Sequence, residues 1–340
     1  MLRALFACTF LLAASVSAQS TDWNRRISDI RIVHPPGSPP GTWKVAASVE
    51  WAADDSAPAP VDLSFEMRID LNGTQIDLQT CDVTLALPQP CNWSVCNGGY
   101  CSSYWANNHH LYVGSCQQIF FGSGQSMCGC AVPIELSGGP WNSSLYSTDM
   151  ITVTLTPLAG SLPEVETSDD SLSRLVGDNP IGSAFCFGDG STATACPCAN
   201  PGSAGHGCAN SQDAGGALLE ATGWSQVDPN TGTDTVVLHG SHMTATSTAI
   251  YLKGSSSNPT GVLFGDGVRC TAGSLIRLRV KINVGGASRF PESGDPSLSV
   301  AGGTPPGSGL TATYQTYYRD PASYCTALTY NITNVVSLDW

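Results

Sequence analysis

Apolar and polar residues alternate with a period of two in four stretches of the N-terminal half. These stretches are residues 28–33 (SDIRIV), 43–51 (WKVAASVEW), 61–71 (VDLSFEMRIDL) and 150–158 (MITVTLTPL). Successive side chains of a β-strand point to opposite faces, so this alternation predicts strands with one buried face. The Asn-Gly pair within LNGTQ predicts a hairpin turn between two of them. Several short strands at this spacing favour a β-sandwich.

The C-terminal half repeats the pattern. Between residues 216 and 340, strands are predicted in GALLEAT, DTVVLHG, TAIYLKG, GVLF, GVRC, LIRLRVKI, TATYQTYYR and VVSLDW. No helix is predicted there, and long amphipathic helices are absent from both halves. We therefore expect an all-β protein with two β-sandwich domains stapled by disulfides. Residues 19–176 are expected to form an immunoglobulin-like sandwich, residues 177–184 (GDNPIGSA) a linker, and residues 185–340 a jelly-roll-like or immunoglobulin-like sandwich.

The first 18 residues have the features of a secretory signal peptide. Arg3 is followed by an apolar run from Leu5 to Ala14, and Ala18 suits a cleavage site. A lipoprotein signal with Cys8 as the acylated residue is the alternative, but the apolar run continues beyond that cysteine. No later stretch has the roughly 18 apolar residues that a membrane span needs. We expect cleavage near Ala18 and a secreted or cell-surface protein.

The charge balance narrows the class of partners. The chain has 14 Lys and Arg against 27 Asp and Glu, a net charge of −13. Because nucleic acid is itself negatively charged, it is not an expected ligand of such an acidic chain. Residues 19–176 contain 16 acidic and 6 basic residues, whereas residues 177–340 contain 11 and 7. This unequal distribution supports two separate units.

Cysteines are the most informative residue type. Of 14 in the chain, thirteen follow the signal peptide, and in an exported protein they are expected to form disulfides. A zinc site is the alternative, but the central Cys-Pro-Cys lacks the usual C-x2-C spacing. We expect the first four cysteines of the C-terminal half to pair among themselves and the last two with each other; in order they are Cys186, Cys196, Cys198, Cys208, Cys270 and Cys325.

Residues 81–130 combine seven cysteines with many aromatic residues. We expect a long insertion loop, held by its own disulfides, that presents aromatic rings to a sugar or a protein. The expected ligand-binding residues are Trp93, Tyr100, Tyr104 and Trp105. Two alternatives stay open: the rings pack around the disulfides, or the adjacent His109 and His110 bind copper or zinc. The odd number of cysteines leaves one thiol free or paired outside the segment.

Two groups of acidic residues are candidate calcium ligands. No cofactor is expected, and calcium is the alternative at these two groups. The phrase FGDG occurs twice and contains Asp189 and Asp266; the second group is Glu164, Glu166, Asp169 and Asp170. An Asp-Gly pair between apolar residues is first of all a tight turn. The second group could also act as an acid and base pair, but its composition favours a solvated acidic turn. Neither FGDG phrase supplies the spaced ligands of a complete calcium loop.

Motifs of catalytic sites are absent from the sequence. There is no G-x-S-x-G, no H-E-x-x-H and no phosphate-binding glycine loop, so no catalytic residue is assigned. His239 and His242 stand three apart in LHGSHM, where a strand followed by a turn gives them no shared face, and we expect a surface pair. The predicted function is adhesion, binding of a glycan or a surface protein, or envelope structure. The alternative is a secreted hydrolase of the glycosidase type, whose paired carboxylates come from distant strands.

Two resemblances to known families agree with this prediction. VAASVEW, APAPVDLSFEMRIDLNGTQI and ITVTLTPLAGSLPEVETSDDS resemble parts of the bacterial cell-adhesion-related (CARDB) domain, an immunoglobulin-like sandwich. In residues 185–340, FCFGDGS, CPCANPGSAGHGCANS, VLFGDGVRC and IRLRVKINVGGASRFPESGD resemble a C-terminal domain of secreted proteins from Planctomycetes and related bacteria. These resemblances imply a bacterial surface or secreted protein with a reused attachment or assembly module, and they assign no catalytic residue.

Overall fold

The computed structural model describes residues 23–35, 37–53, 61–86, 100–105, 111–120, 126–158, 168–321 and 324–340. Side chains are described in these ranges except for residues 23–24, 50–53, 61–64, 82–86, 100–105, 111–120 and 126–135. Strands account for 52% of the structure and helices for 3%, which confirms the all-β class predicted from the alternation.

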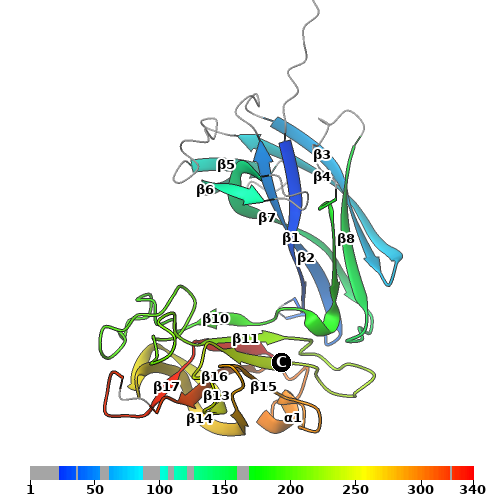
Figure 1. The fold of residues 1–340 in the computed structure, drawn as a ribbon. Helices are drawn as coiled ribbons and strands as arrows, with labels where there is room; N and C mark the ends of the chain where they lie inside the picture. The colour runs from blue at the N-terminus through cyan, green and yellow to red at the C-terminus, as the bar shows by residue number, and fades with distance from the viewer. Residues whose placement is uncertain are drawn as a thin grey trace, which may run out of the picture.

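Antiparallel strands of the N-terminal half join into one nine-stranded sheet (Figure 1). They are β1 (Trp23–Val33), β2 (Thr42–Ala53), β3 (Val61–Leu71), β4 (Thr74–Ala86), β5 (Tyr100–Trp105), β6 (Leu111–Phe120), β7 (Ser126–Asn142), β8 (Met150–Pro157) and β9 (Ser171–Leu175). Their order is β1-β2-β7-β6-β5-β4-β3-β8-β9. The two ends of this order meet, because the Ile27 N–H donates to the Asp169 carbonyl and Arg174 pairs with Asp29. The sheet therefore folds over on itself like a sandwich and encloses a core that includes Ile30, Trp43, Phe65, Ile69 and Val153.

The strands predicted from alternation in this half correspond to β1, β2, β3 and β8. The predicted hairpin turn is also present, since Asn72 and Gly73 connect β3 to β4 with φ angles of 51° and 79°. By contrast, residues 81–130 are not one long loop. Residues 100–105 and 111–120 form β5 and β6, which link β4 to β7. Their composition suggested a loop, but pairing with neighbouring strands satisfies their backbone groups.

The C-terminal half contains two further antiparallel sheets within the described ranges (Figure 1). The larger has the order β10-β18-β16-β13-β14 with β17 beside β16, and the smaller has the order β11-β12-β15. Their strands are β10 (Ser183–Phe185), β11 (Leu218–Thr222), β12 (Val237–Ser241), β13 (Thr248–Phe264), β14 (Gly267–Ile282), β15 (Ser288–Phe290), β16 (Thr311–Arg319), β17 (Tyr330–Ile332) and β18 (Val335–Asp339). Residues of both sheets share a second core, which includes Leu219, Leu238, Tyr251, Phe290 and Tyr314.

Helical structure is confined to two short pieces of the described chain, a 3₁₀ turn at Val176–Asp178 and α1 at Leu298–Gly302. The sequence did not predict α1, because one turn and a half is too short to show a helical period. The buried Lys253 ammonium donates to the Gly302 carbonyl at the end of this helix, 2.6 Å away, and to the Thr304 hydroxyl. Burial lowers the pKa of Lys253. No helix in these ranges combines the length and apolar character that crossing a membrane requires.

Disulfides join all six cysteines of the C-terminal half: Cys186 to Cys270, Cys196 to Cys208, and Cys198 to Cys325. The prediction that these six cysteines are oxidised is confirmed. The predicted pairing is wrong for two of the three bonds, because Cys186 and Cys198 reach across to the cysteines that we expected to pair with each other.

The observed disulfide pairing differs from the predicted one because of the position of residues 186–210. This segment packs on the β13–β14 hairpin: the Thr194 N–H donates to the Thr260 carbonyl, and the Asn200 amide donates to the Asp266 carbonyl. Cysteines close in sequence therefore reach different partners, Cys186 a partner on β14 and Cys198 one in the loop between β16 and β17, so nearness along the chain does not decide the pairing.

Contacts also connect the two halves. Trp224, which follows β11, is 3% exposed and belongs to the core of the N-terminal sheet. Close by, the Asp228 carboxylate accepts a hydrogen bond of 2.7 Å from the Ser147 N–H. The segment predicted as a linker thus runs alongside a packed junction.

Candidate functional site

The strand β14 forms one edge of the larger C-terminal sheet. It pairs with β13 on one side and, among the described strands, with none on the other. An edge strand leaves a row of backbone N–H and C=O groups without strand partners, and proteins commonly protect such edges with charges and bulges. Here the charges come together with exposed apolar side chains: Leu275, Ile276, Val280 and Ile282 are 42, 39, 56 and 61% exposed.

A β-bulge in β14 decides which of these side chains share a face. Tyr251 lies opposite Arg279, but the next residue, Leu252, lies opposite Arg277, so Leu278 is the extra residue. Strict alternation in LIRLRVKI would put all three basic residues on one face. The extra residue Leu278 shifts the alternation of side chains by one position. Arg277 therefore lies on the same face as Val280 and not on the face of Arg279.

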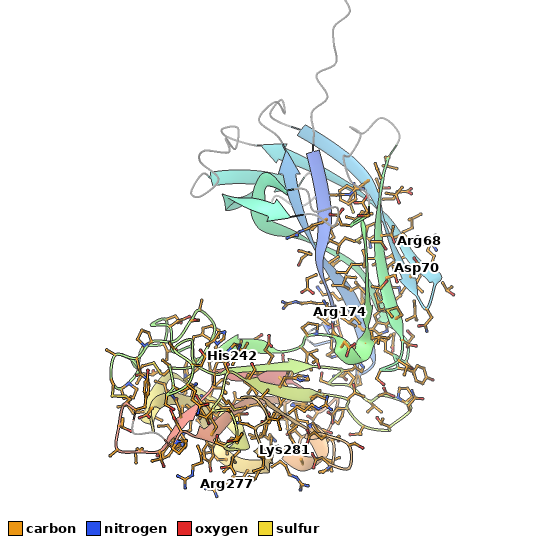
Figure 2. The ribbon with its side chains drawn as sticks, viewed as in Figure 1. Arg68, Asp70, Arg174, His242, Arg277 and Lys281 are labelled. Carbon is orange, nitrogen blue, oxygen red and sulfur yellow. A yellow bond between two sulfur atoms is a disulfide. The ribbon has the colours of Figure 1, made fainter. Side chains whose placement is uncertain are left out.

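Leu275, Arg277, Val280 and Ile282 therefore line one face of the edge, and we call them the β14 edge surface. All four side chains are exposed. Figure 2 shows Arg277 at the lower rim of the C-terminal half. Among the described residues Arg277 makes no ion pair. Its guanidinium is thus available to a partner and lies next to apolar groups that water solvates poorly.

The other basic residues of this strand are bonded within the chain. The Lys281 ammonium lies 2.6 Å from both Glu292 and Asp295, and Arg279 lies 3.0 Å from Asp295. The hydrogen bond from Lys281 is the main cause of a lowered pKa at Asp295. Burial alone would lower the pKa of Lys281, but the bonds to Asp295 and Glu292 raise it. These ion pairs fasten β14 to the segment after β15, and they occupy both carboxylates.

Aromatic side chains extend the edge surface across the sheet. Val280 lies opposite Ile250, and Ile250 lies opposite Tyr317, so the three side chains form a row on one face. Tyr317 contacts the ring of Phe264, with ring centroids 5.6 Å apart, and Phe264 contacts Tyr330 at 4.9 Å.

A second basic group completes this face. The Arg269 guanidinium lies over the Phe264 ring at 5.2 Å, a cation–π contact, and like Arg277 it makes no ion pair within the described residues. The sheet therefore presents a half-buried apolar and aromatic surface flanked by two arginines whose charges are not neutralised by a neighbouring carboxylate.

An open cavity of about 610 Å³ lies at the C-terminal end of β14. Its lining includes Ile282, Val284, His239, Arg289 and Glu292. His239 donates to or accepts from the Thr222 hydroxyl at 2.9 Å. Burial, followed by the nearby Arg289 charge, lowers the pKa of His239, so the ring is neutral at pH 7. Ile282 and Val284 in this lining extend the β14 edge surface beyond the end of the strand. Val284 is 80% exposed.

The carboxylates predicted as calcium ligands have structural hydrogen bonds. Asp189 accepts from the Ser191 N–H and hydroxyl and from the Gly205 N–H, and the Ser191 hydroxyl is the main cause of its lowered pKa. Asp266 lies in the two-residue turn between β13 and β14 and accepts from the Thr326 N–H at 2.7 Å. Both FGDG phrases thus contain turns, as their composition indicates.

The second acidic group is only partly described. The Asp170 carboxylate forms a buried, two-bond ion pair with Arg25, at 2.7 and 3.1 Å, and Asp169 is half-buried beside it. Glu164 and Glu166 lie outside the described residues. Nowhere in the described ranges do three or more His, Cys, Asp or Glu side chains gather in a way that suits a metal ion.

The aromatic residues predicted to bind a ligand stay a prediction, because none of their side chains is described. Trp93 lies outside the described residues, as do His109 and His110. The backbones of Tyr100, Tyr104 and Trp105 belong to β5, and their side chains are not described.

The β14 edge surface was not among the sites predicted from the sequence. The pattern of LIRLRVKI predicts a strand, but the bulge that mixes its basic and apolar residues leaves no signal in the sequence. The one available hint was charge: four of the seven basic residues of residues 177–340 are Arg269, Arg277, Arg279 and Lys281, all on β14. No protein-family model matches the chain, and no curated protein is similar to it.

Proposed function

We propose that this chain is an extracellular, non-catalytic binding protein that holds an extended acidic segment of a partner protein along β14. The observation that carries this proposal is the bulge at Leu278, which places Arg277 among exposed aliphatic side chains on an unpaired strand edge. An extended segment that adds to such an edge gains backbone hydrogen bonds, while alternate side chains meet the exposed face.

The chemistry of the edge indicates which partner fits. Aliphatic side chains on β14 suit the β-branched residues of a strand, and Arg277 and Arg269 suit carboxylates. A neutral glycan would use the aromatic rings but neither the backbone edge nor the arginines. An acidic, β-branched polypeptide uses all of them.

The wider arrangement supports an adhesion or assembly role outside the cell. Three disulfides favour an oxidising compartment, in agreement with the expected signal peptide. The two halves have separate cores, and we interpret them as two β-sandwich domains, the first immunoglobulin-like. In this interpretation the C-terminal half serves attachment, as the resemblance to secreted bacterial modules also implies.

Fluorescence anisotropy with the purified mature protein tests the proposal. The probe is a labelled peptide of about eight residues that alternates Glu with Val, and the comparison peptide alternates Lys with Val. We expect the acidic peptide to bind and to weaken with rising salt. Arg277→Glu should weaken binding about tenfold or more, a loss of about 1.4 kcal/mol.

Two controls separate the edge from general charge effects. Arg31→Glu changes the net charge equally at an exposed position of the N-terminal half and should leave binding unchanged. Val280→Thr keeps a β-branched side chain but removes apolar area, and it should weaken binding. Equal binding of both peptides, or selective capture of a glycan on an array with no peptide binding, contradicts the proposal.

A further inference from the structure

Two histidines from distant parts of the sequence lie side by side in the C-terminal half. His206 belongs to the loop before β11. His242, which Figure 2 labels, directly follows β12. Their ring centroids are 5.2 Å apart and their planes meet at 67°. His239, three residues before His242, contacts the Thr222 hydroxyl instead.

Each ring is anchored through its Nδ1 atom. His206 Nδ1 lies 2.8 Å from the Gly216 carbonyl oxygen, and His242 Nδ1 lies 2.7 Å from Asp213 Oδ2. A carbonyl oxygen and an ionised carboxylate only accept hydrogen bonds, so in both rings Nδ1 carries the hydrogen. A neutral imidazole has one N–H, and each Nε2 therefore keeps its lone pair.

This pattern is the one that metal-binding histidines use. Such a histidine donates its other N–H to a carboxylate or a backbone carbonyl, which fixes the ring and its tautomer. The spacing also fits. With metal–nitrogen bonds of about 2.1 Å and a near-tetrahedral angle, two ligating rings have centroids roughly 5 Å apart.

We propose that His206 and His242 bind a transition-metal dication through their Nε2 atoms, with Zn²⁺ and Cu²⁺ as the fitting ions. Imidazole nitrogen suits both, and Cu²⁺ binds more tightly at equal geometry. With two protein ligands the site is open, and water or an anion completes the coordination shell. The site is independent of the β14 edge surface.

The surroundings hold the two rings in place before any ion arrives. The His206 N–H donates to the Ser203 carbonyl, the His206 carbonyl accepts from Gly188, and the disulfide of Cys208 follows two residues later. Asp189 binds the Gly205 N–H, so this predicted calcium ligand instead stabilises the loop that carries His206. Pre-organisation of this kind lowers the entropy that binding must overcome.

The second ring is held equally well and is open to solvent. The His242 carbonyl accepts a hydrogen bond from Asn210, and the residue has a φ of 56°, which non-glycine residues seldom adopt. Its side chain is 51% exposed, so an ion can reach it. The Asp213 carboxylate, 2.7 Å from His242 Nδ1, places an acceptor and negative charge beside this ring.

Calorimetric titration of the metal-free mature protein with Zn²⁺ alone tests the proposal. We expect His206→Gln and His242→Asn each to remove one binding event; Asn is chosen at position 242 because it tolerates positive φ. Asp213→Ala leaves both ligands but frees the His242 ring, and it should weaken binding about 10- to 100-fold. His239→Gln, three residues from His242, is the matched control and should bind as the unmodified protein does.

If His206→Gln and His242→Asn take up Zn²⁺ with unchanged stoichiometry and affinity, the two rings are not ligands. Failure of the unmodified protein to bind either Zn²⁺ or Cu²⁺ leads to the same conclusion, and the rings then form an edge-to-face packing pair. Thermal unfolding of each metal-free variant shows whether it is folded; if a histidine variant is not, unchanged affinity in Asp213→Ala rejects the site.

Discussion

The side chain of Asn179 pairs with both backbone groups of Ile32. The Ile32 N–H donates to Asn179 Oδ1 at 2.7 Å, and Asn179 Nδ2 donates to the Ile32 carbonyl at 2.8 Å. Asn179 is fully buried and lies within the segment expected to be a linker, whereas Ile32 belongs to β1. Asn179 also accepts a hydrogen bond from the Gly223 N–H through its own carbonyl, so it connects both halves of the chain.

Replacing Asn179 by Ala should destabilise the protein by about 2–4 kcal/mol, because two buried backbone groups of Ile32 lose their partner. Urea unfolding measures this difference. Asn142→Ala, at an exposed asparagine near the junction, is the control and should change stability by less than about 0.5 kcal/mol. If Asn179→Ala lowers the free energy of unfolding no more than the control does, water replaces the amide at little cost.

Trp224 should couple the unfolding of the two halves. It comes from the C-terminal half but is buried in the N-terminal core, so Trp224→Ala removes a large side chain from a packed site. We expect a loss of about 3–5 kcal/mol, as for other buried tryptophans. Calorimetry should then separate one transition into two, since the halves have their own cores. A variant that still unfolds in one transition at the original temperature contradicts this role.

Non-reducing peptide mapping should recover the three disulfide-linked pairs of the C-terminal half, with Cys186 joined to Cys270 and Cys198 to Cys325. Replacing both Cys198 and Cys325 by Ser opens a loop with a sequence separation of 127 and should cost about 2–5 kcal/mol. Recovery of a peptide that links Cys270 to Cys325 would restore the pairing expected from the sequence and reject the observed one.

The ion pairs of Asp295 should give a defined pH dependence. A carboxyl whose pKa is lowered by folding stabilises the folded state fully above the unfolded value, about 3.9, and loses that contribution as the pH falls through the lowered one. Asp295→Asn should therefore reduce stability at pH 7 by on the order of 1 kcal/mol.

The difference between the unmodified protein and Asp295→Asn should shrink between about pH 5 and pH 2. Urea unfolding at several pH values measures it. Asp178→Asn, at an exposed aspartate, serves as the comparison. A difference that stays constant down to pH 2 shows that the charge of Asp295 does not act through Lys281.

The sequence alone determined the local features of this protein. Alternation located β1, β2, β3 and β8 because a half-buried strand must alternate, wherever its partners lie. The turn at Asn72 and Gly73 was predictable for the same reason: positive φ angles are a local demand that few residue types meet. Oxidation of the six C-terminal cysteines could likewise be inferred from residue types. Export stays a prediction, because the expected signal peptide lies outside the described residues.

Only the tertiary structure decided which distant residues meet. A single extra residue at Leu278 moved Arg277 to the apolar face of β14, and a bulge depends on the register with β13 rather than on local composition. Cys186 reached Cys270, and His206 reached His242, because long-range packing of the loops on the strands brought them together. Strand propensity and turn chemistry act over a few residues, whereas these contacts depend on how the sheets stack, and that is set by the burial of the whole core.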